Sequence, residues 1–313
     1  MLAIRIQRFG TPEVIELQDI ARPVPGDAEV LIRVAAAGVG PWDAWVRSGK
    51  SVLDQPLPLT LGSDVAGRIE AVGAQVKGFT VGQAVFGVTG ERFTGGYAEY
   101  ALAPAGCVAV KPKRLSFVEA ASVPVVAVTA QQMLFEHARL RAGERVLIHG
   151  AGGNVGAYAL QLAKAARAEV VGTDVGPGVD YARSLSAGPV LDVQSSDFAS
   201  GLAPFDVVID TVGGDVQRRS FALLKPRGRL ISSVSRPDAE QAAKLGVEAS
   251  FMLVHVTTAE LSRLAELLDA GALVTRVGAV LALDEARAAH EMLDGKRPRP
   301  AGKIVLQVAE LDG

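Results

Sequence analysis

The sequence predicts an α/β protein with two domains, one rich in β-strands and one built on a doubly wound parallel sheet. Three observations lead to this fold class. At 313 residues the chain is longer than one ordinary core requires. Its first third consists of short alternating strands. From about residue 115 onward, apolar strands alternate with helix-length segments around a glycine-rich turn.

The β-rich domain is predicted from runs of alternating apolar and polar residues that glycine or proline interrupts. These runs cover residues 2–7, 14–19, 29–36, 64–72, 84–88, 97–103 and 107–110. Near the end of the chain, a short helix at 284–294 precedes Gly295, and residues 303–308 are expected to form a closing strand.

The second domain is predicted from apolar strands that are separated by stretches long enough for helices, at residues 145–149, 169–173, 206–210, 229–233 and 250–254. This alternation is typical of a parallel sheet with helices on both faces. A helix is expected over 258–270, because Thr257 and Glu260 match a capping box. Three leucines then fall on one face of that helix, Leu261, Leu264 and Leu268.

Composition restricts the class of partner. Hydrophobic residues make up 49% and charged residues 21%, which is typical of a globular protein. The net charge of −2 provides no extended positive field, so neither nucleic acid nor a membrane surface is expected as a partner, and a small-molecule substrate is favoured. We expect no signal peptide and no membrane span. The single cysteine, Cys107, permits no intrachain disulfide and favours a cytoplasmic location.

The glycine-rich turn carries the first functional signal. Residues 150–156 read GAGGNVG, between a predicted strand and a helix rich in small residues. Glycines allow a tight bend and close approach to a pyrophosphate, and the free N–H groups of a helix N-terminus favour anionic oxygens. Because strand, turn and helix occur in the required order, the sequence predicts a dinucleotide site. Its phosphate-binding part is Gly153, Asn154, Val155 and Gly156.

An acidic residue supports this interpretation. Asp174 follows the second strand of the domain, where a carboxylate accepts hydrogen bonds from the adenosine ribose. A carboxylate there would repel a 2′-phosphate, which favours NADH over NADPH. The alternative is that Asp174 only begins the loop at 175–179.

With these motifs in order, the whole chain resembles the medium-chain dehydrogenase/reductase superfamily, specifically its zinc-independent quinone oxidoreductase branch. The segments that carry the resemblance are 38–43 (GVGPWD), 47–49 (RSG), 61–67 (LGSDVAG), 95–100 (GGYAEY), the turn, 210–214 (DTVGG) and 302–305 (GKIV). The resemblance implies a GroES-like catalytic domain at 1–120 and 272–313, with a Rossmann domain inserted at 121–271. It also implies a homodimer.

The resemblance implies the absence of zinc as well. Zinc-dependent relatives have a cysteine ligand at the position matching Pro41 and a histidine ligand at the position matching Ser63. Neither proline nor serine replaces those ligands. The four-cysteine structural zinc lobe of those relatives is also missing. Two positions depart from the branch: Gly40, where an asparagine is common, and Asp174, where many relatives have small or hydroxylated residues and prefer NADPH. NADH and NADPH therefore both stay open.

The activity implied is NAD(P)H-dependent transfer of a hydride to a quinone or an activated alkene such as an enone, with proximity supplying most of the catalysis. Two alternatives stay open. One is an enoyl reductase acting on a carrier-bound thioester, for which no basic docking helix is evident. The other is a non-catalytic nucleotide-binding or structural relative. Turnover of simple quinones distinguishes the enzyme from the latter.

The candidate site residues follow from the resemblance. The nicotinamide half is expected near Thr129, Val212, Ser233, Phe251 and Leu253, and the adenosine near Thr173 and Asp174. Catalytic candidates are Tyr97 and Asp43, and substrate-cleft candidates are Gly40, Trp42 and Asp64.

Each cleft candidate has a structural alternative. Tyr97 can be a packed tyrosine with a satisfied hydroxyl, and Asp43 can pair with Arg47 four residues on. Trp42 fits either the core or a quinone ring, and Trp45 is assigned to the core. The four histidines share no metal-binding spacing.

Overall fold

The structure, a computed structural model, describes residues 1–185, 188–195, 198–199, 202 and 204–311. The chain forms two compact units. The first comprises Met1–Val125, Val256–Gly271 and Thr275–Gly313, and the second comprises Val126–His255 and Ala272–Val274. The predicted fold class, a GroES-like β-rich domain and a Rossmann parallel-sheet domain, is confirmed.

The division into two units differs from the sequence-based expectation at three segments: residues 121–125 and 256–271 lie in the first unit, and residues 272–274 lie in the second. The helix α8 (Thr258–Asp269) lies in the first unit, although it was expected in the Rossmann domain. The first residue of this helix explains its place, because the Thr258 hydroxyl lies 2.7 Å from the carbonyl oxygen of Val108, to which it donates, and 3.0 Å from that of Ala105. The predicted capping box is confirmed, with Thr257 Oγ1 accepting the Glu260 N–H at 3.3 Å.

The larger sheet of the first unit has the strand order β15–β16–β3–β5–β6–β8, with β7 also paired to β3. A smaller antiparallel sheet has the order β2–β1–β4. The strands are β1 (Leu2–Ile6), β2 (Glu16–Asp19), β3 (Glu29–Val39), β4 (Leu59–Thr60), β5 (Asp64–Val72), β6 (Ala84–Val88), β7 (Tyr100–Pro104), β8 (Val108–Val110), β15 (Val277–Ala282) and β16 (Lys303–Gln307).

The register of β3 with its two neighbours positions the later site. Gly38 of β3 is opposite Asp64 on one side and Val305 on the other. Residues at the start of β5 and at the start of β16 therefore meet at the end of β3. The helix α1 (Pro41–Ser48) begins directly after β3, with Pro41 at its first position, and ends at Gly49, which has φ 72°.

Two expectations for this unit differ from the structure. Tyr97 lies before β7 rather than in it, since the strand begins at Tyr100. The C-terminal strand β16 has a parallel neighbour, β15, that the sequence analysis did not predict. Gly278 and the register shift between Val277 and Ala279 interrupt the alternation that would have revealed β15 in the sequence.

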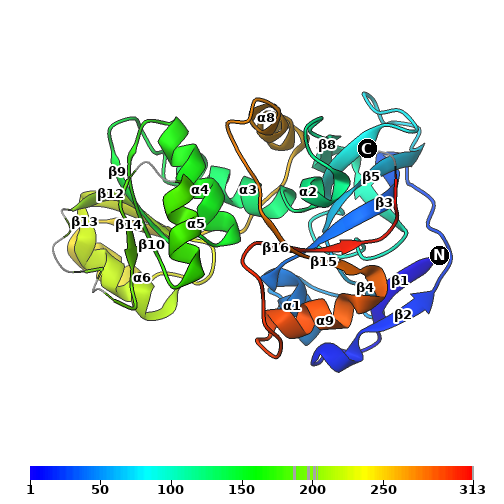
Figure 1. Ribbon diagram of the computed structural model, residues 1–313, viewed down its shortest axis with the longest axis horizontal. Helices are drawn as coiled ribbons and strands as arrows, with labels where there is room; N and C mark the ends of the chain where they lie inside the picture. Colours follow the sequence, from blue (N-terminus) through cyan, green and yellow to red (C-terminus); the bar gives the residue numbers. More distant parts are fainter. Residues whose placement is uncertain (186–187, 196–197, 200–201, 203, 312–313) are drawn as a thin grey trace. The chain divides into compact units, whose positions relative to one another are not determined.

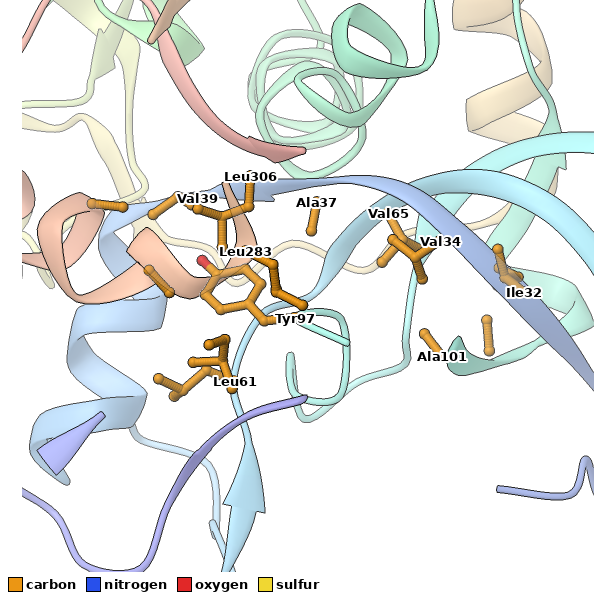
Figure 2. Close-up of a cluster of buried hydrophobic side chains, with 14 of the residues drawn as sticks. Ile32, Val34, Ala37, Val39, Leu61, Val65, Tyr97, Ala101, Leu283 and Leu306 are labelled. Carbon is orange, nitrogen blue, oxygen red and sulfur yellow. The ribbon is translucent and has the colours of Figure 1, made fainter. Parts of the chain in front are cut away.

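A buried apolar cluster holds the first unit together. Figure 2 shows Val34, Ala37 and Val65 from the β3–β5 pair, and the Tyr97 ring beside Leu61 and Leu283. Leu283 belongs to the short helix η5 (Leu283–Glu285), which precedes α9 (Ala286–Leu293). The remaining helical segments of this unit are η1 (Pro12–Val14), η2 (Ala105–Cys107) and α2 (Phe117–Ala121). The helix α3 (Pro124–Gln131) begins at its edge.

The second unit is built on a parallel sheet with the strand order β11–β10–β9–β12–β13–β14 (Figure 1). The order reverses at β9, and a ligand site of such sheets lies where the order reverses, at the carboxyl ends of the strands. The strands are β9 (Arg145–His149), β10 (Glu169–Asp174), β11 (Val190–Asp192), β12 (Phe205–Asp210), β13 (Leu224–Ser232) and β14 (Glu248–Phe251).

Helices cover this sheet. The helices α4 (Asn154–Ala165) and α5 (Pro177–Leu185) pack beside β9 and β10, as Figure 1 shows. A second apolar cluster joins Leu147, Val208 and Leu230 of the sheet to Phe221 and Ala242. The other helical segments are η3 (Gln132–His137), α6 (Gly214–Ser220), η4 (Phe221–Leu223) and α7 (Ala239–Leu245). Among the described residues, no helix is both long and apolar enough to cross a membrane.

Candidate functional site

The glycine turn after β9 forms a cradle for an anionic group. A Cβ on Gly156 would lie 2.1 Å from the Gly150 carbonyl oxygen, and one on Gly152 would lie 2.1 Å from the Gly178 carbonyl oxygen. Both positions therefore need glycine because backbone passes too close. Gly153, in contrast, is exposed and caps α4 without a side chain. The first N–H groups of α4, from Asn154 onward, are therefore suited to bind a pyrophosphate.

Asp174, at the end of β10, faces this turn. Its Oδ2 accepts the Gly152 N–H at 2.5 Å, and its Oδ1 accepts the Val175 N–H at 2.7 Å. The carboxylate is thus fixed in orientation and part of the turn, while each oxygen retains a lone pair for a further donor. The glycine turn and the acidic residue, which the sequence predicts as two parts of one nucleotide site, therefore lie in direct contact.

Thr173 lies on the interior side of the same strand end. The side chain is 2% exposed, and its hydroxyl is 2.7 Å from His149 Nδ1. His149 Nε2 is 2.8 Å from Ser220 Oγ, which donates to the Val216 carbonyl. His149 therefore donates from Nε2, and its burial lowers its pKa to about 4. Sequence reasoning gave His149 no role, yet it joins the ends of β9 and β10 to α6.

The residues expected near the nicotinamide lie at several places in this unit. Val212 and Leu253 are 52% and 57% exposed beyond the ends of β12 and β14. Ser233 directly follows β13, Phe251 ends β14, and Thr129 is buried in α3.

The loop that carries Val212 is fixed by Asp210, which is fully buried. Its Oδ1 accepts the N–H groups of Val212 and Gly213 at 3.0 and 2.8 Å. Its Oδ2 accepts hydrogen bonds from Gln217 and Ser232, each at 2.8 Å. Four donors satisfy this carboxylate, so the backbone leading to Val212 has a defined conformation.

In the first unit, Asp43 and Tyr97 form a buried pair, and neither side chain is exposed. The Tyr97 hydroxyl donates to Asp43 Oδ2 at 2.9 Å, and the same oxygen accepts the Gly40 N–H at 2.8 Å. Burial raises the pKa of Asp43 to about 7 and raises the pKa of Tyr97 well above its ordinary value. This geometry matches the packed tyrosine with a satisfied hydroxyl that the sequence left open. It fixes the backbone where β3 passes into α1.

The expected Asp43–Arg47 pair is wrong. Arg47 instead contacts both carboxylate oxygens of Asp294, at 3.1 and 2.8 Å, and its Nε donates to the Gly10 carbonyl. Its Nη1 is 3.1 Å from Nδ1 of the buried His290. Although Asp43 and Arg47 are four residues apart on α1, residues far away in the sequence provide the partners. Arg47 thus fastens α1 to the end of α9.

A second buried ion pair lies beside the start of α1. Lys303 Nζ is 2.8 Å from Asp64 Oδ2, with side-chain exposures of 2% and 0%. Asp64 Oδ1 also accepts the Val125 N–H at 3.1 Å. Desolvation raises the pKa of Asp64, and the charge of Lys303 opposes that shift. Asp64, a predicted site residue, is therefore neutralised by a lysine that the sequence analysis noted only as part of a motif.

Trp42 lies against this ion pair. Lys303 Nζ is 4.2 Å from the centre of the Trp42 ring, and the indole N–H donates to Ser63 Oγ at 3.1 Å. The indole is partly buried. Trp45, expected in the core, is 45% exposed, so that assignment is wrong. The face of α1 that carries Val46 and Arg47 is buried, and the helical period directs Trp45 outward.

A parallel sheet that presents an uncapped glycine turn and an adjacent acid, together with a GroES-like unit, is the architecture of dinucleotide-dependent dehydrogenases and reductases. Comparison with known proteins leads to the same class of protein. Residues 26–113 match the alcohol dehydrogenase GroES-like domain, and residues 185–306 match the zinc-binding dehydrogenase family. The quinone oxidoreductase of Sus scrofa is 37% identical, over 98% of this chain and 97% of that protein.

Solved structures of similar proteins lead to the same class of protein. The quinone oxidoreductase from Coxiella burnetii has a TM-score of 0.91 at 34% identity, with 99% of each chain covered. The Escherichia coli quinone oxidoreductase complexed with NADPH has a TM-score of 0.86 at 25% identity, with 97% of this chain and 100% of that chain covered. The chain belongs to the quinone oxidoreductase branch of the medium-chain dehydrogenase/reductase superfamily.

The residues present fit a nicotinamide dinucleotide but not zinc. At Gly152 and Gly156 the turn packs closely against neighbouring backbone, and the helix that follows offers the free N–H groups that suit a pyrophosphate. At the positions of zinc ligands in relatives, Pro41 has no donor atom, and Ser63 Oγ already accepts the Trp42 N–H. No group of three or more potential ligands (His, Cys, Asp or Glu) is found in the part of the chain that the structure describes.

Proposed function

We propose that this protein is an NAD(P)H-dependent oxidoreductase that reduces quinones or enones without a metal ion. The observation that carries the proposal is the glycine cradle at the carboxyl end of β9, with Asp174 bonded into it. The names of similar proteins support the acceptor class. Besides the quinone oxidoreductases, a 2-methylene-furan-3-one reductase of Solanum lycopersicum is 37% identical over 66% of this chain and 55% of that protein.

The chain's own groups would bind and orient the cofactor. The N–H groups of Asn154 and Val155 would hold the pyrophosphate, and Asp174 would accept hydrogen bonds from the adenosine ribose. When bound, the reduced nicotinamide supplies a hydride to the electrophilic carbon or oxygen of the acceptor, and a proton from solvent completes the hydroquinone or saturated ketone. Val212, fixed through Asp210, would provide apolar contact for the nicotinamide ring.

We further propose that the enzyme prefers NADH. The Asp174 carboxylate is held by two N–H groups, so it cannot readily turn away from a 2′-phosphate. Residues 174–180 read DVGPGVD and contain no lysine or arginine that would neutralise that phosphate. A fixed negative charge without a nearby cation disfavours NADPH.

The experiment that tests the activity follows the loss of NADH or NADPH absorbance after addition of para-benzoquinone, and separately of a simple enone. We expect turnover with at least one acceptor. Cofactor binding without turnover of any acceptor would refute the enzyme and favour a nucleotide-binding protein. Prior treatment with a metal chelator should leave the rate unchanged, and a rate lost to the chelator and restored by zinc would refute the metal-free mechanism.

The cofactor preference is tested with Asp174→Ser. Removing the carboxylate should raise kcat/KM for NADPH relative to NADH by about tenfold, equivalent to about 1.4 kcal/mol. Asp215→Ser is the matched control, because Asp215 is an exposed aspartate of α6 whose ion pairs, with Arg218 and Arg219, lie within the same helix. An unchanged ratio in Asp174→Ser would remove this residue from the adenosine site.

A further inference from the structure

A row of buried polar side chains crosses the carboxyl end of the parallel sheet. Strand register aligns four residues of β10, β9, β12 and β13 in this row, namely Thr173, His149, Asp210 and Ser232. Thr173 is 2% exposed and the other three are fully buried. Residues that are opposite each other on neighbouring strands point to the same face of the sheet. The row therefore supports the loops that follow these strands, where the ligand site of such a sheet lies.

His149 is the member of this row that contacts several parts of the unit. Its Nδ1 accepts the Thr173 hydroxyl of β10 at 2.7 Å. Its Nε2 donates to Ser220 Oγ of α6 at 2.8 Å. Its carbonyl oxygen accepts the Thr211 hydroxyl, directly after β12, at 2.7 Å. Along the chain, His149 immediately precedes the glycine turn.

These contacts connect the two ends of the proposed cofactor site. Thr173 precedes Asp174, the adenosine end of the site. Thr211 precedes Val212, the nicotinamide end. The strand β9 lies between the two strands concerned, β10 and β12 (Figure 1). A dinucleotide occupies both ends at once, so its affinity depends on their separation, whereas the affinity of a ligand of one end does not.

The imidazole of His149 is suited to hold that separation. In its neutral form it has one acceptor and one donor on a rigid ring. The ring packs edge-on against Phe198, with ring centroids 4.9 Å apart and an interplanar angle of 73°. Loss of the ring would leave the buried Thr173 hydroxyl without this acceptor, which is costly in an interior. The bonds on both sides of the ring therefore resist separation.

We propose that His149 is a positioning residue that sets the separation between the adenosine end and the nicotinamide end of the dinucleotide site. It is fully buried, so its side chain acts through Thr173 and Ser220 and not by contact with the cofactor. This inference rests on the proposed nicotinamide-dependent function. It assigns to one residue beneath the glycine turn the part of the cofactor affinity that requires both ends.

The first test compares NADH, which occupies both ends, with ADP, which occupies the adenosine end and the glycine turn. His149→Phe retains an aromatic ring but removes both side-chain hydrogen bonds. The Kd of NADH, measured from the fluorescence of the reduced nicotinamide, should rise by about tenfold. The Kd of ADP, measured by isothermal titration calorimetry, should stay within about twofold.

Asp206→Asn is the matched control. Asp206 lies near the amino end of β12, at the opposite end of the same sheet. Its carboxylate accepts the Arg145 N–H and pairs with Lys225. This variant weakens the sheet away from the cofactor, so both Kd values should stay within about twofold. A tenfold rise of the NADH Kd in this control would overturn a specific role of His149.

Ser220→Ala provides a second test that keeps the imidazole in place. It removes the acceptor of the Nε2 hydrogen and should raise the Kd of NADH by about threefold, with the Kd of ADP unchanged. Adding Ser220→Ala to His149→Phe should have no further effect, because the bond is already absent. If His149→Phe does not fold, an unchanged NADH Kd in Ser220→Ala overturns the inference.

These outcomes separate the inference from the proposed function. An unaltered protein that binds neither NADH nor NADPH refutes the proposed function, and NADPH replaces NADH as the probe if it alone binds. A folded His149→Phe protein whose dinucleotide Kd stays within about twofold overturns the role of His149. An equal rise in the Kd of ADP also overturns it, because general loosening of the unit would weaken both ligands alike.

Discussion

Replacing Lys303 by methionine removes the positive charge of the buried ion pair and retains most of the side-chain volume. Asp64 is then left with the Val125 N–H as its hydrogen-bond donor among the described residues. Breaking a buried pair from one side costs about 3–5 kcal/mol. Protonation limits this loss. An aspartate has an ordinary pKa of 3.8, so neutralising it at pH 7 costs about 4 kcal/mol, at about 1.36 kcal/mol per pH unit.

Protonation of Asp64 also makes the stability of the Lys303→Met protein depend on pH. In Lys303→Met the folded-state pKa of Asp64 is raised above its unfolded value, so the folded state binds the additional proton. Its stability is then greatest at low pH and falls as the pH rises. The loss relative to the unaltered protein should therefore be about 4 kcal/mol at pH 7 and only about 2 kcal/mol at pH 5.

Urea unfolding followed by tryptophan fluorescence measures this loss, because Trp42 and Trp45 both report on the first unit. The double variant Asp64→Asn/Lys303→Met removes both charges and should recover most of the lost stability. A loss below about 1 kcal/mol at pH 7 would refute the reasoning, as would a loss that does not decrease toward pH 5.

Three further predictions concern other buried groups. His149 has its pKa lowered to about 4, so the folded protein should lose stability as the pH falls from about 6.5 toward 4, and His149→Gln should reduce that slope in urea unfolding. Asp43 has its pKa raised to about 7, so its contribution declines as the pH rises from about 4 to 7, and Asp43→Asn should remove this decline. Arg47→Met leaves His290 and Asp294 without their shared partner and should lower the free energy of unfolding by about 3 kcal/mol. The control is Arg183→Met, which breaks an exposed ion pair within a helix and should change the free energy of unfolding by less than about 1 kcal/mol.

Local patterns revealed much of the fold. The strands at 64–72, 84–88 and 145–149 have the predicted bounds, because alternation or apolar runs there end at glycine or proline. The capping box at Thr257 likewise depends only on neighbouring residues. The helix α5 was not anticipated. Its first turn contains Pro177 and Gly178, which favour a loop, and its contacts with α4 and β10 override that preference.

The sequence predicted only part of the candidate site. The glycine turn and Asp174 are local in character, since a turn must follow its strand and an acid must end the next one, so their meeting was predictable. The side-chain partners of Arg47 were not predictable, because helical spacing suggested Asp43, whereas His290 and Asp294 are 243 and 247 residues away in the sequence. The spacing of residues along the sequence does not indicate pairs that are this far apart.

The sequence by itself determined the two-domain α/β class and the glycine turn between strand and helix, because each depends on residue type and local order. Only the tertiary structure decided that Lys303 neutralises Asp64, that Trp42 lies against this ion pair and that Trp45 faces solvent. Strand register and helix rotation bring these side chains together across the chain. Buried charges and close-packed rings then leave few alternative positions for them.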